Sequence, residues 1–177
     1  MRTMRIASRS VVARHVRVDL RILPRVALHG QTGMIEFTIP GDAVPWARAG
    51  KRGPHTGAPQ KMSFTPAKQR NYAGVIKMFY ERAAPSLTLI EGPVEVSVVA
   101  TYLWPASWSA RKRALPGAQW KVSKPDWDNL GKIVGDALNK VAWRDDSQIA
   151  CGFVWKKYGE VASLKVRIRS LATGEST

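Results

Sequence analysis

An apolar stripe that follows an acidic segment is the feature that most constrains this chain. Residues 124–132 read Lys-Pro-Asp-Trp-Asp-Asn-Leu-Gly-Lys. Apolar residues then recur at helical spacing, which predicts a helix over about Asn129–Val141 with one buried face. The residues of this stripe are Leu130, Ile133, Val134, Ala137, Leu138 and Val141. The sequence therefore places two carboxylates at the start of a helix that packs on a hydrophobic core.

The rest of the pattern predicts an α+β fold. Val94–Leu103 is the strongest strand candidate, because valines alternate along it and β-branched residues favour strands. Thr65 followed by Pro66 marks the start of a helix that runs to about Ala84. Further strands are expected at 34–40, 147–156 and 161–169, with a loop or loose hairpin at 43–62. The order β-α-β-α-β-β predicts a small mixed β-sheet packed with two main helices.

The charge balance points to a polyanionic partner. The chain has 28 basic and 13 acidic residues, which gives a net charge of +15. Five of the 13 acids fall between Asp126 and Asp146, so the carboxylates are concentrated in one place. Carboxylates bind hard cations, whereas lysine and arginine bind phosphate. This distribution predicts a Mg²⁺- or Mn²⁺-dependent enzyme that acts on nucleic acid.

Composition excludes several other classes. A single cysteine, Cys151, excludes an internal disulfide and a cysteine-based zinc cluster, and it is expected to be a buried small hydrophobe. The three histidines, His15, His29 and His55, lie in regions that look irregular or N-terminal, which gives no support to a histidine-based site. No apolar run reaches the roughly 18 residues that a membrane span needs, so no membrane partner is expected.

Residues 1–33 differ in composition from the rest of the chain. They hold seven arginines, no lysine and one acid, Asp19. They read as a targeting peptide, as a basic arm that lies on DNA, or as an extension without function, and we favour the last. A folded domain is expected over 34–177. Residues 34–177 keep 21 basic and 12 acidic residues, a net charge of +9, so the prediction of a nucleic-acid partner does not depend on the extension.

Each acidic residue of the cluster has a structural and a functional interpretation. Asp128 fits the N-cap of the helix, which is the usual role of such an aspartate, whereas Asp126 has no such role and suggests a cation between the two. Lys132 is either half of a surface ion pair with Asp136 or a group that contacts a phosphate. Asp145 and Asp146 read as a polar turn, and their spacing brings them near the end of the helix rather than its start.

The combined motif resembles the RusA family of Holliday-junction resolvases. The similar residues are Lys-Pro-Asp-Trp-Asp-Asn-Leu-Gly-Lys-Ile-Val-Gly-Asp-Ala-Leu-Asn and the later Asp-Asp-Ser-Gln-Ile, and the resemblance extends from about Met34 to Arg169. It implies a Mg²⁺- or Mn²⁺-dependent endonuclease that acts as a homodimer on four-way DNA. It also implies metal ligands at Asp126, Asp128 and the pair Asp145-Asp146, of which we favour Asp146. The catalytic lysine of the family falls on Lys132.

A basic loop before the motif is the expected DNA contact. Its cations are Arg111, Lys112, Arg113, Lys121 and Lys124. They would hold the DNA backbone, while Trp108 or Trp120 either stacks on exposed bases or packs under the loop.

The expected function is junction resolution by phosphodiester hydrolysis in recombination and repair. The enzyme would be cytoplasmic and nucleoid-associated, and encoded by a bacterium, phage or prophage. The alternatives are a basic nucleic-acid-binding protein without catalysis and an inactive prophage relic of the same fold.

Overall fold

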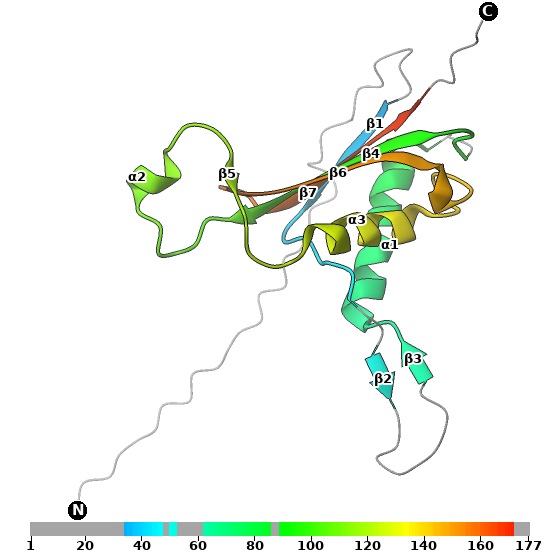
Figure 1. Cartoon of the computed structure of the whole chain (residues 1–177), viewed down its shortest axis with the longest axis horizontal. Helices are drawn as coiled ribbons and strands as arrows, with labels where there is room; N and C mark the ends of the chain where they lie inside the picture. The colour runs from blue at the N-terminus through cyan, green and yellow to red at the C-terminus, as the bar shows by residue number, and fades with distance from the viewer. Residues whose placement is uncertain (1–33, 48–49, 53–61, 86–88, 172–177) are drawn as a thin grey trace, which may run out of the picture.

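Five strands form one mixed sheet in the order β1-β7-β4-β6-β5 (Figure 1). The computed structural model describes residues 34–47, 50–52, 62–85 and 89–171. The strands are β1 (Met34–Pro40), β4 (Val94–Leu103), β5 (Gln119–Trp120), β6 (Ile149–Gly159) and β7 (Ser163–Ser170). β4 and β6 are parallel, and the other neighbours are antiparallel. A mixed sheet results because the chain returns to β6 through a helix and to β7 through a tight turn.

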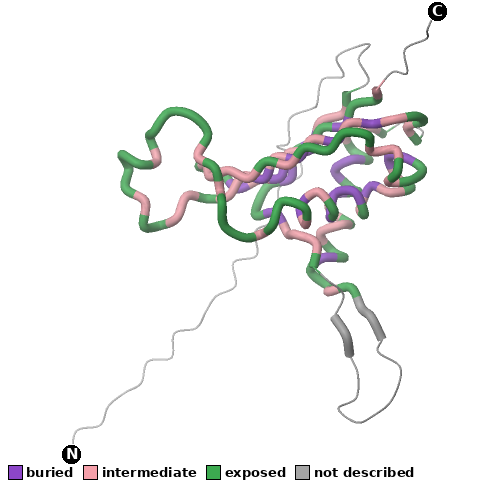
Figure 2. Tube along the Cα trace, in the orientation of Figure 1, coloured by how far each residue is buried: buried purple, intermediate pink, exposed green. Residues whose placement is uncertain are grey.

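Two helices, α1 (Ala67–Ala83) and α3 (Trp127–Leu138), cover one face of this sheet (Figure 1). The alternation in β4 buries Val94, Val96, Val98 and Ala100 beneath them. The stripe of α3 is buried against the same layer, and Figure 2 shows the buried segments between helices and sheet. The expected α+β fold, with two main helices on a small mixed sheet, is confirmed.

Element boundaries differ from the expected ones by a few residues. α1 is preceded by Pro66 at the N-cap, without a side-chain cap from Thr65. α3 starts at Trp127, two residues earlier than predicted, and ends at Leu138, shortly before Lys140 takes a positive φ of 60°. The loose hairpin is present as β2 (Gly50–Arg52) paired with β3 (Met62–Phe64). Three short elements were not predicted, namely α2 (Ala110–Arg113), β5 and the 3-10 turn η1 (Asp146–Gln148).

Some expectations fall outside the described residues. They concern the extension at 1–33 and the three histidines His15, His29 and His55. Among the residues that the structure describes, no helix is both long and apolar enough to cross a membrane.

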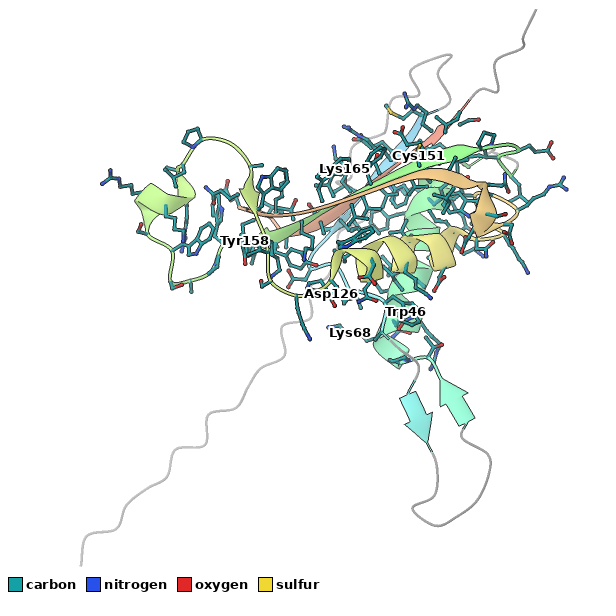
Figure 3. All side chains as sticks on the ribbon, in the orientation of Figure 1. Trp46, Lys68, Asp126, Cys151, Tyr158 and Lys165 are labelled. Atoms are coloured by element: carbon teal, nitrogen blue, oxygen red, sulfur yellow. The ribbon has the colours of Figure 1, made fainter. Side chains whose placement is uncertain are left out.

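No helix in the described part of the chain covers the second face of the sheet, and this face corrects the prediction for Cys151. Cys151 lies beside Glu95 of β4 in the sheet, and its side chain is exposed on this face. The alternate residues Gly152 and Val154 face the helices. Phe153 and Trp155 share the uncovered face and stack with a ring separation of 5.6 Å. Figure 3 shows Cys151 and Lys165 on the sheet, on the side away from α3. A continuous apolar run does not reveal which alternate residues a strand buries.

An ion-pair ladder on the uncovered face gives a prediction for acid stability. Lys165 and Arg167 both bind the Glu36 carboxylate, and the hydrogen bond from Lys165, at 2.8 Å, is the main cause of a lowered Glu36 pKa. The stabilisation is therefore present above the unfolded value near 4.5 and is lost as the pH falls through the folded pKa. Glu36→Gln should lower the free energy of unfolding by up to about 1 kcal/mol at neutral pH. Urea unfolding of both proteins should show this difference disappearing in acid, and a difference independent of pH would contradict the assignment.

Candidate active site

The entry to α3 differs from the predicted cap. Asp126, not Asp128, occupies the N-cap with extended backbone (φ −71°, ψ 148°), and its side chain accepts no capping hydrogen bond. Asp128 lies in the first turn of the helix, so its predicted role as the N-cap is wrong. Both carboxylates are exposed at the helix N-terminus, where the helix dipole favours negative charge. The capping interpretation therefore does not account for Asp128.

The exposed side of α3 and β6 together form a pocket of about 400 Å³. Asp128, Lys132 and Asp136 line it from the helix at intervals of four residues, or about 6 Å per step. Asp146 lines it from the segment before β6. The pocket therefore brings together three of the four predicted catalytic residues, Asp128, Lys132 and Asp146. The fourth, Asp126, lies just before α3 (Figure 3) and is not among the lining residues.

Gly131 allows α3 to lie close to β6 at this pocket. A Cβ atom on Gly131 would come within 3.2 Å of the Val154 side chain. A Cβ on Gly135 would lie 3.9 Å from Oδ2 of Asp146 and also 3.9 Å from Ile149. Asp146 is thus next to the second half of α3, as the spacing of the acidic pair predicted.

The acidic pair divides into a capping residue and a pocket residue. Asp145 caps η1, and its carboxylate accepts a 2.9 Å hydrogen bond from the Ser147 N–H. Hydrogen bonding to the Ser147 side chain first, and to this N–H second, lowers the pKa of Asp145. Gln148 completes the capping box by accepting from the backbone N–H of Asp145. Asp146 is not used in this way, and its carboxylate lines the pocket. The polar-turn interpretation therefore describes Asp145 and leaves Asp146 as the candidate for chemistry.

Trp143 fixes the orientation of Asp146 and was missed in the sequence. Its indole Nε1 donates a 3.0 Å hydrogen bond to Oδ1 of Asp146 while the ring is fully buried in the core. A buried indole N–H needs an acceptor, and Asp146 supplies it. Asp146 is thereby connected directly to the packed interior. The sequence shows a tryptophan three residues before Asp146, but the hydrogen bond between the two side chains depends on the conformation of the turn that joins them.

Asp136 is exposed on α3, and it also lines the pocket. Desolvation is the main cause of a raised Asp136 pKa, the Lys132 charge acts in the opposite direction, and the Asp146 charge raises the pKa further. Two aspartates near each other in one pocket repel unless a proton or cation lies between them. The end of the pocket that Asp136 and Asp146 share therefore has two neighbouring carboxylates in its wall.

Lys132 lies between the two acidic ends of the pocket and over an aromatic ring. Its Nζ is 4.1 Å from the centroid of the Trp46 ring, a cation–π geometry. Trp46 in turn donates its backbone N–H to the carbonyl of Asn129 at 2.9 Å, which fixes the segment before β2 against the first turn of α3. Trp46 lies more than 80 residues before Lys132, so periodicity and local motifs gave no sign of this contact.

The carboxylates are spread along the pocket. Within the described ranges, no three histidine, cysteine, aspartate or glutamate side chains gather closely enough to hold a metal ion. The rise of the helix explains this, because Asp128 and Asp136 are separated by about 12 Å along α3. Asp146 lies at the Asp136 end and Asp128 at the other.

The predicted DNA-binding cations lie on the loop that extends from β4 to α3. Arg111 and Lys112 on α2 are exposed, as is Lys124, whereas Arg113 is half-buried and bonds the carbonyl of Ala106 at 3.4 Å. Lys121 donates to Ser123 at 2.6 Å. The helix α2, which carries the exposed Arg111 and Lys112, lies well beyond the end of the sheet (Figure 1).

The two loop tryptophans have different surroundings. Trp108 packs against Tyr158 with a ring separation of 5.0 Å and carries Lys112 at 4.1 Å over its ring, so it supports the loop. Trp120 on β5 is 57% exposed. Of the two candidates for base stacking, Trp120 is the one whose ring is available.

Comparison with known proteins agrees with this geometry. The family model for endodeoxyribonuclease RusA matches residues 40–169, which include the whole pocket and the basic loop. A protein of Bacillus subtilis (strain 168), described as the uncharacterized protein YqaN, is 33% identical over 142 residues, covering 78% of this chain and 97% of the relative. RusA proteins are endonucleases that act on Holliday-junction DNA. The chain belongs to the RusA endodeoxyribonuclease family.

Proposed function

We propose that this protein is a metal-dependent, structure-selective endonuclease that resolves four-way DNA junctions by hydrolysing phosphodiester bonds in the α3–β6 pocket. The observation that carries the proposal is the position of Lys132 between Asp128 and the Asp136–Asp146 end of one pocket. A cation flanked by carboxylates suits a phosphate that must be bound and then stabilised as charge develops on it. Family membership supports the same chemistry.

The donor atoms fit Mg²⁺ or Mn²⁺. Mg²⁺ takes oxygen ligands and is commonly bound by one or two carboxylates, with substrate phosphate and water as the other ligands, so a cage of three protein ligands is not needed. The proposed ligands are Asp128 and Asp126 at the start of α3 and Asp146 at the other end of the pocket. When bound, the ion supplies positive charge to the phosphate oxygens and makes water a better nucleophile.

The protein side chains perform the remaining tasks. Lys132 donates hydrogen bonds to a phosphate oxygen, and the Trp46 ring under its Nζ limits where the ammonium can lie. Trp143 holds Asp146 in one orientation, so that its Oδ2 remains directed toward α3. Such fixed groups stabilise a transition state without reorganising when the reaction occurs.

The basic loop provides the affinity for DNA in this proposal. Replacing Arg111 and Lys112 together with alanine should weaken junction binding and reduce the slope of log K against log salt concentration by about 1 for each phosphate that the variant no longer binds. Cleavage by the saturated enzyme should change little. Lys77→Ala on α1 is the matched control, because Lys77 forms an exposed pair with Glu81 far from the loop in sequence. An unchanged salt slope in the double variant would remove α2 from the DNA interface.

A homodimer that uses the uncovered sheet face is part of the same proposal. Phe153 and Trp155 are 45% and 38% exposed there, and a sheet face with a stacked aromatic pair gains stability when a second layer covers it. A two-fold dimer would present two pockets to the two symmetric strands of a junction. Trp155→Glu should yield a monomer by light scattering, whereas Met78→Glu, an exposed apolar position on α1, should not. A dimeric Trp155→Glu protein would place the interface elsewhere.

The experiment that tests the function compares DNA shapes. The full-length protein should cut a labelled four-way junction in the presence of Mg²⁺, and cut a linear duplex of the same sequence far more slowly. A protein that binds both DNAs without cutting either would favour the non-catalytic alternative or the inactive relic. As an active resolvase it would work on bacterial or phage DNA in the cytoplasm.

A further inference from the structure

Lys156 on β6 binds the segment that leads into α3. Its Nζ donates to the carbonyl oxygen of Pro125 at 2.6 Å and to that of Ser123 at 3.0 Å. Pro125 immediately precedes Asp126, the N-cap of the helix. Lys156 is half-buried and occupies the helix-facing side of β6, in line with Val154, which packs at Gly131. One strand therefore contacts both α3 and the turn before it.

The contacts of Lys156 extend to the residues on either side of it. Lys121 donates its backbone N–H to the carbonyl of Lys156 at 2.9 Å, and its Nζ bonds the Ser123 hydroxyl at 2.6 Å. That hydroxyl also lies 3.5 Å from the hydroxyl of Tyr158, the next helix-facing residue of β6 (Figure 3). The segment before α3, residues 121–125, thus lies along β6. Of these contacts, the hydrogen bond from Lys156 to Pro125 is the one nearest to Asp126 in the chain.

The same strand also fixes the other acidic segment. β6 begins at Ile149, just after η1, whose first residue is Asp146. The two carboxylate-bearing segments, one at each end of the pocket, are therefore both connected to β6. A cation-binding site needs its ligands held at fixed separations, and groups that hold those ligands in place affect ion affinity.

We propose that Lys156 is a positioning residue that sets the location of Asp126 relative to Asp146 by binding the carbonyls of Ser123 and Pro125. The proposal rests on the function proposed above, since it assigns the positioned carboxylate to ion binding. A charged donor shared by two carbonyls is a strong local restraint, because hydrogen bonds with an ionised partner exceed neutral ones in strength. Lys156 is not assigned any contact with the substrate.

The first test measures the restraint itself in the full-length protein, without metal or DNA. Lys156→Met keeps the length and apolar stem of the side chain but removes its donors. Hydrogen exchange should become about 10-fold faster or more in the amides of residues 130–133, whose N–H groups make the first intrahelical hydrogen bonds of α3, while the amides of β4 and β7 exchange as before. Lys157→Met is the matched control, because Lys157 is the next residue of β6 and points to the opposite face. It should leave the exchange of residues 130–133 unchanged.

The second test measures ion binding and cleavage. Mn²⁺ affinity, followed by electron paramagnetic resonance without DNA, should fall about 10-fold in Lys156→Met, as expected when a group that orients a ligand is removed. The Mg²⁺ concentration for half-maximal junction cleavage should rise by a similar factor, with unchanged junction affinity in EDTA. Lys156→Arg should restore most of the affinity because it keeps a charged donor.

The outcomes separate the two proposals. If Lys156→Met exchanges and binds Mn²⁺ as the wild type does, Lys156 does not position Asp126. The same conclusion follows if Lys157→Met reproduces its defects. If the wild type cuts no junction, the proposed function fails, while hydrogen exchange and Mn²⁺ binding still decide the role of Lys156.

Discussion

Asp146→Asn should reduce single-turnover cleavage of a four-way junction by at least about 100-fold while junction binding stays close to that of the wild type. The asparagine keeps an oxygen for the Trp143 indole but removes the charge from the pocket, and this charge is what a bound cation requires. Rates measured with enzyme in excess over labelled junction, and affinities measured in EDTA, separate the two effects.

The neighbouring residue offers a matched control. Asp145→Asn changes the same charge one position away, but Asp145 caps η1 and is exposed. It should cut at nearly the wild-type rate, with a stability loss of about 1 kcal/mol or less, because asparagine is also a good cap. Equal loss of cleavage in both variants would contradict the division of the pair into a cap and a pocket residue.

Lys132→Ala should lower the single-turnover rate by about 100-fold or more and barely change the melting temperature. Lys132 is exposed on α3, so the attraction between its charge and Asp136 contributes little to stability. If Lys132 were only half of a surface ion pair, its removal would leave cleavage normal. Rate and melting temperature measured on one preparation distinguish the two roles.

Two companion variants identify what Lys132 contributes. Lys140→Ala, just beyond the end of α3, removes the same charge outside the pocket and should cut normally. Trp46→Leu removes the ring under the Lys132 Nζ and should reduce the rate by a smaller factor, of about 3–30, because it removes a cation–π interaction worth about 0.5–2 kcal/mol. A Trp46→Leu rate equal to that of the wild type would show that the ring does not position Lys132.

Much of the fold follows from local pattern. The alternation in Val94–Leu103 and the stripe from Leu130 to Leu138 gave the central strand and the main helix of the core, because burial on one face imposes a visible period. The helix start was predicted two residues late. The N-cap position depends on the backbone angles of a single residue, which sequence propensity does not resolve. Asp128 was therefore predicted at the N-cap, whereas Asp126 occupies that position.

The site was only partly predictable for a different reason. The acidic residues and Lys132 stand out by composition in a basic chain, and the turn before β6 correctly placed Asp146 near the second half of α3. Trp46, Trp143 and Lys156 were missed because their contacts depend on tertiary packing. Cys151 was assigned to the core because an apolar run does not show which of its alternate side chains lie on a sheet face that no described helix covers.

The extension can be tested separately from the site. A protein that begins at Met34, the first residue of β1, should fold, dimerise and cut junctions, because residues 34–177 retain a net charge of +9. Nonspecific duplex affinity should fall and depend less steeply on salt, since seven arginines are removed. Loss of folding or of junction cleavage at low salt would make residues 1–33 part of the working enzyme.

Cleavage of one labelled four-way junction by wild type and Asp126→Asn, side by side in Mg²⁺ and in EDTA, tests the central claim most directly. Metal-dependent hydrolysis at this site predicts that the wild type cuts only with Mg²⁺. Asp126→Asn should bind the junction as well as the wild type but not cut it, because it removes a proposed ion ligand and leaves the phosphate-binding cations in place. Cutting in EDTA, or cutting by Asp126→Asn at the wild-type rate with Mg²⁺, would contradict metal-dependent hydrolysis at the start of α3.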